Sequence, residues 1–181
     1  RSIDELQPAL ELIEADADEE EVILSGGDPL TLSDSRLRSL FNKLDDIPHL
    51  HRLRIHTRLP VMIPQRITVS LLTELGNSRL TKVVVVHANH ESEIDAPVAR
   101  ALTRLVDAGI VVLNQSVLLR GVNDDASTLI GLCRRLIDVR VVPYYLHQLD
   151  PVAGASHFRV PIERGREIIR RVRESLPGYA V

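Results

Sequence analysis

Residues 21–30 read Glu21-Val22-Ile23-Leu24-Ser25-Gly26-Gly27-Asp28-Pro29-Leu30. The apolar start of this stretch is typical of a buried strand, and the Ser-Gly-Gly-Asp-Pro sequence after it indicates a tight polar turn. Two adjacent glycines permit positive φ angles and let a ligand approach the backbone closely. The turn is therefore either one edge of a ligand site or an ordinary strand-to-helix connection, and the turn residues alone favour the second interpretation.

The composition is that of a soluble globular protein with one sizeable core. Of the 181 residues, 44% are hydrophobic and 26% are charged, which argues against disorder. A net charge of -3 and an aromatic content of 3% give no basic field or stacking surface for nucleic acid. No apolar run approaches the length of a membrane span and no signal peptide opens the chain, so we expect a cytoplasmic protein without a membrane partner.

Cysteine usage limits the metal chemistry of the chain. The single cysteine, Cys133, forms no internal disulfide and does not by itself provide a cysteine-ligated zinc or iron–sulfur site. Its leucine neighbours at 129, 132 and 136 indicate core packing instead. The chain begins at Arg1 without methionine and ends at Val181 without a polar tail, and we expect it to be part of a longer protein.

A regular spacing of strands predicts the architecture. Strands are expected to start near positions 22, 53, 83, 111 and 140, at steps of 31, 30, 28 and 29 residues. Helices are expected over residues 3–13, 33–44, 68–75, 91–108, from beyond 124 to 137, and over 162–176, with the acidic run 16–20 as a surface loop. One strand and one helix per step is the pattern of a parallel sheet with helical crossovers. The sequence therefore predicts an α/β fold, either a partial barrel or an open sheet that lacks its first strand.

Polar side chains follow every predicted strand, at residues 25–28, 56–58, 87–90, 114–116 and 144–150. In parallel barrels and α/β sheets, ligands bind at the carboxyl ends of the strands. Five such groups at the same edge favour a ligand site over five unrelated turns.

The single residues at this edge each keep an alternative. His87 and His90 fit hydrogen bonding better than metal ligation, because no spaced carboxylate accompanies them. Asn114 and Gln115 suit a ribose or adenine, or they satisfy buried backbone groups.

The charged residues are equally open. Arg58 and Arg120 either grip a carboxylate or phosphate or pair with a neighbouring acid. Asp150 holds a substrate ammonium group or serves a turn. Walker, Rossmann and nucleophile-elbow patterns are absent. The residues thus indicate a polar, nucleotide-like or amino-acid-like ligand and leave the reaction open.

Taken together, several motifs resemble the lysine 2,3-aminomutase family of radical S-adenosylmethionine enzymes, over nearly the whole chain. They are LSGGDPL at 24–30, RIHTRLP at 54–60, PQRIT at 64–68, HANH at 87–90, NQSVLLRGVND at 114–124 and PYYLH at 143–147. The motifs IPH at 47–49, YYLH at 144–147 and GASHF at 154–158 resemble the branch that acts in β-lysylation of elongation factor P.

The resemblance implies one domain over residues 1–181, a truncated TIM-type (β/α) barrel of about five βα units. It implies an isomerase that moves the amino group of L-lysine from C2 to C3. Its cofactors are S-adenosylmethionine, a [4Fe-4S] cluster and pyridoxal phosphate.

The site residues follow from the motif positions. Those matched to S-adenosylmethionine are Ser25, Gly26, Gly27, Asp28, His87 and Gln115. Asp150 matches the acid that holds the lysine ε-ammonium group, and His147 stands where the degradative enzymes have tyrosine.

Two parts of the family pattern fall outside the chain. The three-cysteine cluster motif is expected before Arg1 and the pyridoxal lysine after Val181, and the two lysines present, Lys43 and Lys82, match neither. No catalytic residue and no metal ligand is therefore assigned, and the polypeptide alone is predicted to be inactive.

Two other classes of protein remain open. One is a metal-dependent barrel hydrolase or aldolase with His87, His90 and Asp150 around a divalent ion. The other is a barrel scaffold without catalytic activity.

Overall fold

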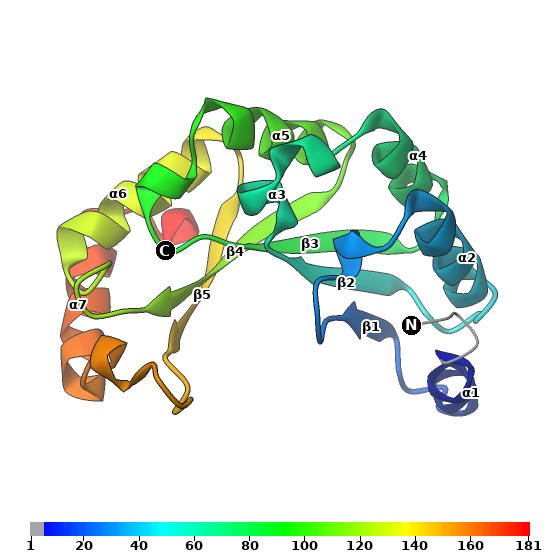
Figure 1. The fold of residues 1–181 in the computed structure, drawn as a ribbon, viewed down its shortest axis with the longest axis horizontal. Coiled ribbons are helices and arrows are strands. Elements are labelled where there is room, and N and C mark those ends of the chain that lie inside the picture. Colours follow the sequence, from blue (N-terminus) through cyan, green and yellow to red (C-terminus); the bar gives the residue numbers. More distant parts are fainter. Residues whose placement is uncertain (1–5) are drawn as a thin grey trace.

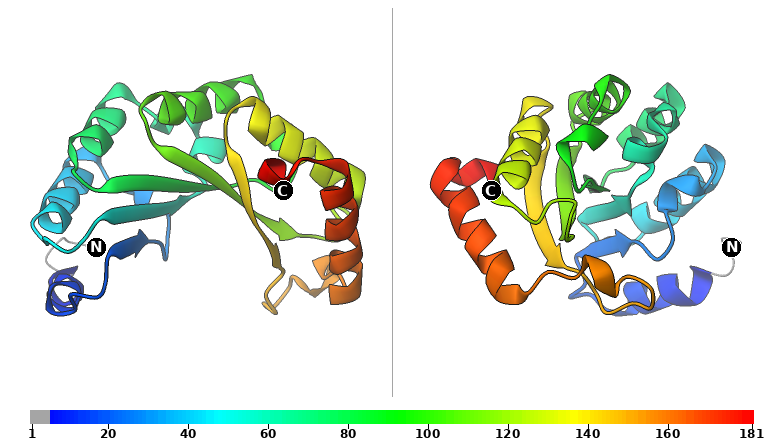
Figure 2. Two further views of the ribbon diagram at one scale, coloured as in Figure 1. Left: turned by 180° about the vertical axis from the view of Figure 1, so that it is seen from behind. Right: turned by 60° about the vertical axis from the view of Figure 1, so that its left-hand side comes forward.

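A single sheet of five parallel strands organises the computed structural model, which describes residues 6–181. The strands lie in sequence order, β1 Glu21–Leu24, β2 Arg52–Thr57, β3 Thr81–His87, β4 Val111–Leu118 and β5 Val142–Gln148. Figure 1 shows that the sheet curves into an arch, and Figure 2 shows the same arch from behind and from one side. The predicted α/β partial barrel is confirmed.

Seven α-helices accompany the strands within the described residues. They are α1 Gln7–Ala15, α2 Asp34–Asp45, α3 Leu59–Met62, α4 Val69–Asn77, α5 Ala96–Asp107, α6 Ala126–Asp138 and α7 Ile162–Ser175. The helices α2, α4, α5 and α6 follow the convex side of the arch (Figure 1). None of the helices in residues 6–181 has the length and apolarity needed to cross a bilayer.

The main core fills the space between the convex side of the sheet and these helices. Side chains alternate along β2, so that Leu53, Ile55 and Thr57 are buried while the residues between them face the concave side. Leu53 and Ile55 pack in one cluster with buried leucines of α2, α4 and α5. In the central strand β3, Val84 to Val86 are all buried, which is typical of a parallel strand covered on both faces.

Side-chain caps start the long helices. Ser33 Oγ accepts a hydrogen bond from the Arg36 amide at 3.4 Å, as the sequence predicts, and Thr68 and Asp95 cap α4 and α5 in the same way. Gly109, with a φ of 78°, follows the end of α5 as expected.

Three predicted boundaries are wrong. The helix expected over 91–108 is divided, because His90 caps a short 3-10 turn at Glu91–Glu93 and Asp95 then caps α5. The strand expected to end at 113 continues to Leu118. The last strand begins at Val142 and not near 140, since the chain first turns through Arg140 at a φ of 61°.

The leading helix is confirmed in part. It occupies Gln7–Ala15, whereas the predicted start at residue 3 lies outside the described residues.

Candidate functional site

The glycine turn after β1 has an open backbone with positive φ angles. Gly26 and Gly27 have φ angles of 77° and 98°, and a Cβ built on either residue would meet no atom within 4 Å. The positive φ angles confirm the conformation predicted for the glycines. Ser25 and both glycines are exposed, so a ligand has direct access to the backbone here.

Asp28 connects this turn to the end of the neighbouring strand. One carboxylate oxygen accepts hydrogen bonds from the Leu30 amide at 3.0 Å and from the Thr57 hydroxyl at 2.7 Å. The other accepts from the amides of Arg58 at 2.7 Å and Leu59 at 3.3 Å. Both oxygens thus serve the protein, a role that the sequence does not predict. A contact between Asp28 and a cofactor stays a prediction.

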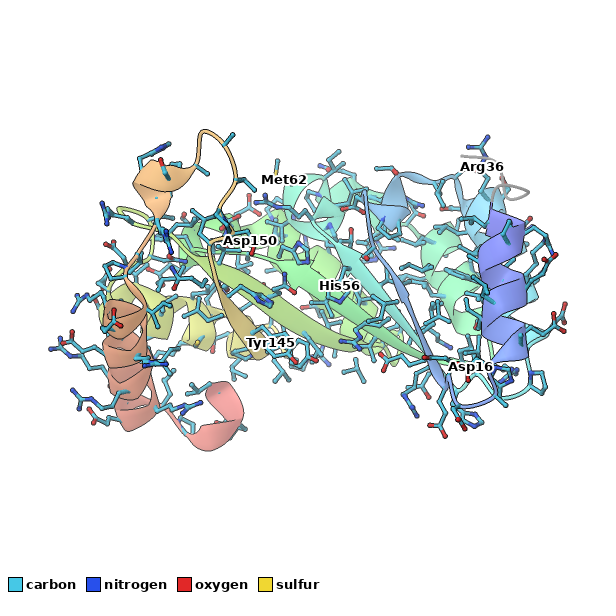
Figure 3. The ribbon with its side chains drawn as sticks, turned by 90° about the horizontal axis from the view of Figure 1, so that it is seen from below. Asp16, Arg36, His56, Met62, Tyr145 and Asp150 are labelled. Carbon is cyan, nitrogen blue, oxygen red and sulfur yellow. The ribbon has the colours of Figure 1, made fainter. Side chains whose placement is uncertain are left out.

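The register of the sheet brings two predicted site residues together. His87 at the end of β3 pairs with Gln115 in β4. His56 in β2 pairs with Val85, two residues before His87, and the two imidazole ring centroids lie 5.8 Å apart at 70°. Figure 3 looks onto the concave face and shows His56 near its middle, with Asp150 toward one end of the strands and Tyr145 toward the other.

Burial favours the uncharged form of both imidazoles. It is the main cause that lowers the pKa of His56 and of His87 below the ordinary value of 6.5. The Nε2 atoms of both rings are shielded from solvent and have no hydrogen-bond partner. Leaving a buried polar group unpaired costs about 1–3 kcal/mol, and such orphaned groups mark places where a ligand or water is accepted.

Asn114 and Ser116 have a structural role. Asn114 Oδ1 accepts a hydrogen bond from the Ala88 amide at 2.9 Å, and its Nδ2 donates to the Ala88 carbonyl at 3.1 Å. The Ser116 hydroxyl donates to the same carbonyl at 2.7 Å. Of the two interpretations open for Asn114, satisfaction of buried backbone is the one observed. It fixes the loop that directly follows His87.

His90 is also engaged within the protein. Its Nδ1 atom accepts a hydrogen bond from the Ser92 amide at 3.1 Å and lies 2.8 Å from the Ser92 hydroxyl. Among residues 6–181, no three His, Cys, Asp or Glu side chains are grouped so that they could hold a metal ion. The hypothesis of a metal-dependent hydrolase, which requires His87, His90 and Asp150 around one ion, therefore has no ligand set in this part of the chain.

Asp150 is exposed just beyond the end of β5, at the carboxyl edge of the strands. His147 lines a groove of about 730 Å³ between β5 and α7. None of His56, His87 and Gln115 lines this groove.

Arg54 and Glu21 are two neighbours of the candidate site that the sequence did not predict. Arg54 forms an ion pair with Glu21, Nε to Oε1 at 2.7 Å, and its Nη1 atom donates to the Tyr144 hydroxyl at 3.4 Å. This contact joins β2 to β5 across the concave face. The alternation of Arg52, Arg54 and His56 with apolar residues was the available signal for a polar inner face.

The lysines do not reach this face. Lys43 donates to the Gln7 side chain at 2.9 Å, and Lys82 donates to the Ser78 carbonyl at 2.7 Å. Together with the single cysteine, this means that the described residues offer neither three thiolates for a cluster nor a lysine on this face for pyridoxal phosphate.

Solved structures share this fold. The chain superimposes on Streptococcus suis SuiB, determined with S-adenosylmethionine bound, with a TM-score of 0.70 and 13% identity over 93% of this chain and 40% of that chain. The structure of anSMEcpe with AdoMet and a peptide gives 0.69 and 12% identity, over 92% of this chain and 50% of that chain. These likenesses establish the class of fold, the partial (β/α) barrel seen in those proteins.

Sequence relatives are more specific. The chain is 50% identical over 175 residues to L-lysine 2,3-aminomutase of Haemophilus influenzae and 47% identical to that of Escherichia coli, over 97% of this chain in both cases. It is 41% identical to the enzyme of Clostridium subterminale over 99% of this chain and 43% of the relative. The resemblance to the lysine 2,3-aminomutases is thereby confirmed.

The chain spans about half the length of these curated relatives, 52% for the Haemophilus protein and 51% for the Escherichia protein. No family model matches the sequence.

Proposed function

We propose that this chain forms the S-adenosylmethionine-binding part of a lysine 2,3-aminomutase, an isomerase that converts L-lysine to β-lysine. The observation that carries the proposal is the 38–50% identity to proteins of that name over at least 97% of the chain. The matched motifs include the glycine turn and the strand ends that carry His87 and Gln115, which supports a shared cofactor site.

In this proposal, the exposed backbone of Ser25 to Gly27 receives the methionyl end of the cofactor. His87 and Gln115, adjacent in the register, bind it from the neighbouring strands. Asp150, at the carboxyl edge, holds the lysine ε-ammonium group. S-adenosylmethionine supplies the radical chemistry of the amino shift, and the cluster and pyridoxal phosphate are held by residues other than those described.

The finer assignment is that the β-lysine serves elongation factor P in the cytoplasm. The motifs at 47–49, 144–147 and 154–158 support this branch. A scaffold without catalytic activity is the remaining alternative, and it would bind neither cofactor nor lysine productively.

The proposal is tested in the native protein that carries this chain, purified anaerobically. Gly27→Ala is expected to weaken S-adenosylmethionine binding, measured by calorimetry, because a side chain at a φ of 98° strains the turn. The matched control is Gly109→Ala, at a φ of 78° beyond α5, which introduces comparable strain away from the site and should leave affinity unchanged.

Turnover is followed as β-lysine by mass spectrometry. Asp150→Asn should raise the lysine KM about tenfold or more, as expected for loss of one charge-assisted contact. A native protein that neither binds S-adenosylmethionine nor forms β-lysine contradicts the proposal.

A further inference from the structure

His56 is a polar residue of the concave face to which neither the sequence motifs nor the relatives assign a role. Its Nε2 atom is buried without a partner, as is that of His87, and the two rings are in edge-to-face contact at 5.8 Å. A side chain that served only the fold would be expected to have its polar atom paired, because an unpaired buried group destabilises the protein.

His56 lies between the two parts of the proposed cofactor site, the glycine turn after β1 and the strand ends that carry His87 and Gln115. Leu24, the last residue of β1, pairs with Ile55, so the glycine turn and His56 each begin one residue beyond the same pair. On its other side, His56 pairs with Val85 in the strand that ends in His87. A ligand that extends from the glycine turn to Gln115 therefore passes over His56.

The hydrogen bonds that Asp28 accepts from the residues after His56 fix the backbone at this position. The hydroxyl of Thr57, the next residue, donates a hydrogen bond to the Asp28 carboxylate. The Arg58 amide donates a hydrogen bond to the same carboxylate at 2.7 Å. The carboxylate that shapes the glycine turn thus also sets the place of His56, which keeps both parts of the site in register.

The charge of the ring suits a cationic ligand. Burial, together with nearby Arg54 and His147, lowers the pKa of His56 against the opposing effect of Glu21, which favours the neutral imidazole. A neutral ring accepts or donates one hydrogen bond without repelling a sulfonium or ammonium group.

We propose that His56 is a further binding residue of the S-adenosylmethionine site, whose Nε2 atom forms a hydrogen bond with the bound cofactor. This inference rests on the proposed function. It adds a contact from β2 to those expected from β1, β3 and β4, so that four successive strands bind one ligand.

The test compares His56→Phe and His56→Gln in the native protein that carries this chain, with S-adenosylmethionine binding measured anaerobically without reductant. Phenylalanine keeps the planar ring and removes the hydrogen bond, and we expect affinity to fall about tenfold. Glutamine retains a polar end and should recover part of the loss.

A second measurement separates binding from folding. Because Nε2 is unpaired without ligand, His56→Phe should leave the ligand-free melting temperature unchanged or raise it. His49→Phe is the matched control, since His49 Nε2 lies 3.0 Å from the Ile13 carbonyl oxygen. That variant should lose stability and keep its affinity.

The outcomes distinguish the two proposals. If the native protein binds the cofactor but His56→Phe binds equally well, or if this variant loses stability with unchanged affinity, His56 serves the fold and the inference is wrong. If the native protein itself does not bind S-adenosylmethionine, the proposed function fails and the inference fails with it.

Discussion

Asp28 illustrates how a single carboxylate at a candidate site acts through the backbone. It accepts hydrogen bonds from the amides of Leu30, Arg58 and Leu59 and from the Thr57 hydroxyl. Hydrogen bonds to a charged acceptor are stronger than those between neutral groups. The conformation of the glycine turn therefore depends on the negative charge of Asp28.

Asp28→Asn is expected to destabilise the protein by about 2–4 kcal/mol, because the amide nitrogen of asparagine cannot accept from these donors. Urea unfolding followed by circular dichroism measures the change. The control is Asp95→Asn at the start of α5, where Asp95 accepts from the Val98 amide and asparagine caps about as well. Equal losses of stability in both variants would contradict this role of the Asp28 carboxylate.

At the residue scale, the sequence predicted what depends on local backbone chemistry. The positive φ of Gly26 and Gly27 and the cap at Ser33 depend on neighbouring residues alone. The partners of Asp28 and Asn114 lie 29 and 26 residues away, so their roles depend on the register of strands, which one sequence does not specify. His56 stood in a predicted strand end, but only the register puts it against His87.

Among the elements, α6 begins at a side-chain cap formed by Asp125. Asp125 accepts hydrogen bonds from the Ser127 hydroxyl, the Thr128 hydroxyl at 2.6 Å and the Thr128 amide at 2.9 Å. These hydrogen bonds lower the pKa of Asp125 from 3.8 to about 2. The folded state therefore stabilises the deprotonated carboxylate of Asp125 relative to the unfolded chain.

Asp125→Ala should lower the free energy of unfolding by about 1–2 kcal/mol at neutral pH. Because the pKa is lowered in the folded state, this contribution is complete above pH 3.8 and is lost as the pH falls toward about 2. The measurement is the free energy of unfolding of both proteins between pH 7 and pH 2. The expected result is a difference that shrinks across this window.

Asp138→Ala at the other end of α6 is the matched control. Asp138 is exposed at the C-terminal end of the helix, where a negative charge is unfavourable. Its removal should be neutral or slightly stabilising. A pH-independent loss in the Asp125 variant would show that packing, and not the charge, supports the helix.

The predicted element boundaries are wrong where more than one residue decides where a helix starts or a strand ends. The capping residues His90 and Asp95 follow one another closely, so one apolar pattern covers two elements. The polar Asn114 and Ser116 were expected to end β4, yet both bury their side chains against Ala88 and the strand continues. Strand polarity marks an end only where the side chain faces water.

At the scale of the whole molecule, the regular spacing of strands carried the fold prediction. The strands begin at Glu21, Arg52, Thr81, Val111 and Val142, about every thirty residues. The curvature that distinguishes a barrel from an open sheet did not follow from spacing and came from the resemblance alone. The arch leaves large apolar side chains of its strands exposed, Ile23 at 47%, Val111 at 47% and Tyr145 at 50%.

The last prediction concerns a polypeptide made of residues 1–181 only. It should retain no [4Fe-4S] cluster and should not cleave S-adenosylmethionine, because Cys133 is its single cysteine and burial raises the pKa of that thiol to about 11. Iron content and the visible spectrum after anaerobic reconstitution measure retention of the cluster. Formation of deoxyadenosine measures cleavage of S-adenosylmethionine. Cys133→Ala is the control, since any iron bound equally by both polypeptides is adventitious. A cluster that forms in the unmodified polypeptide and is lost in Cys133→Ala would contradict the conclusion that its thiolates come from other residues.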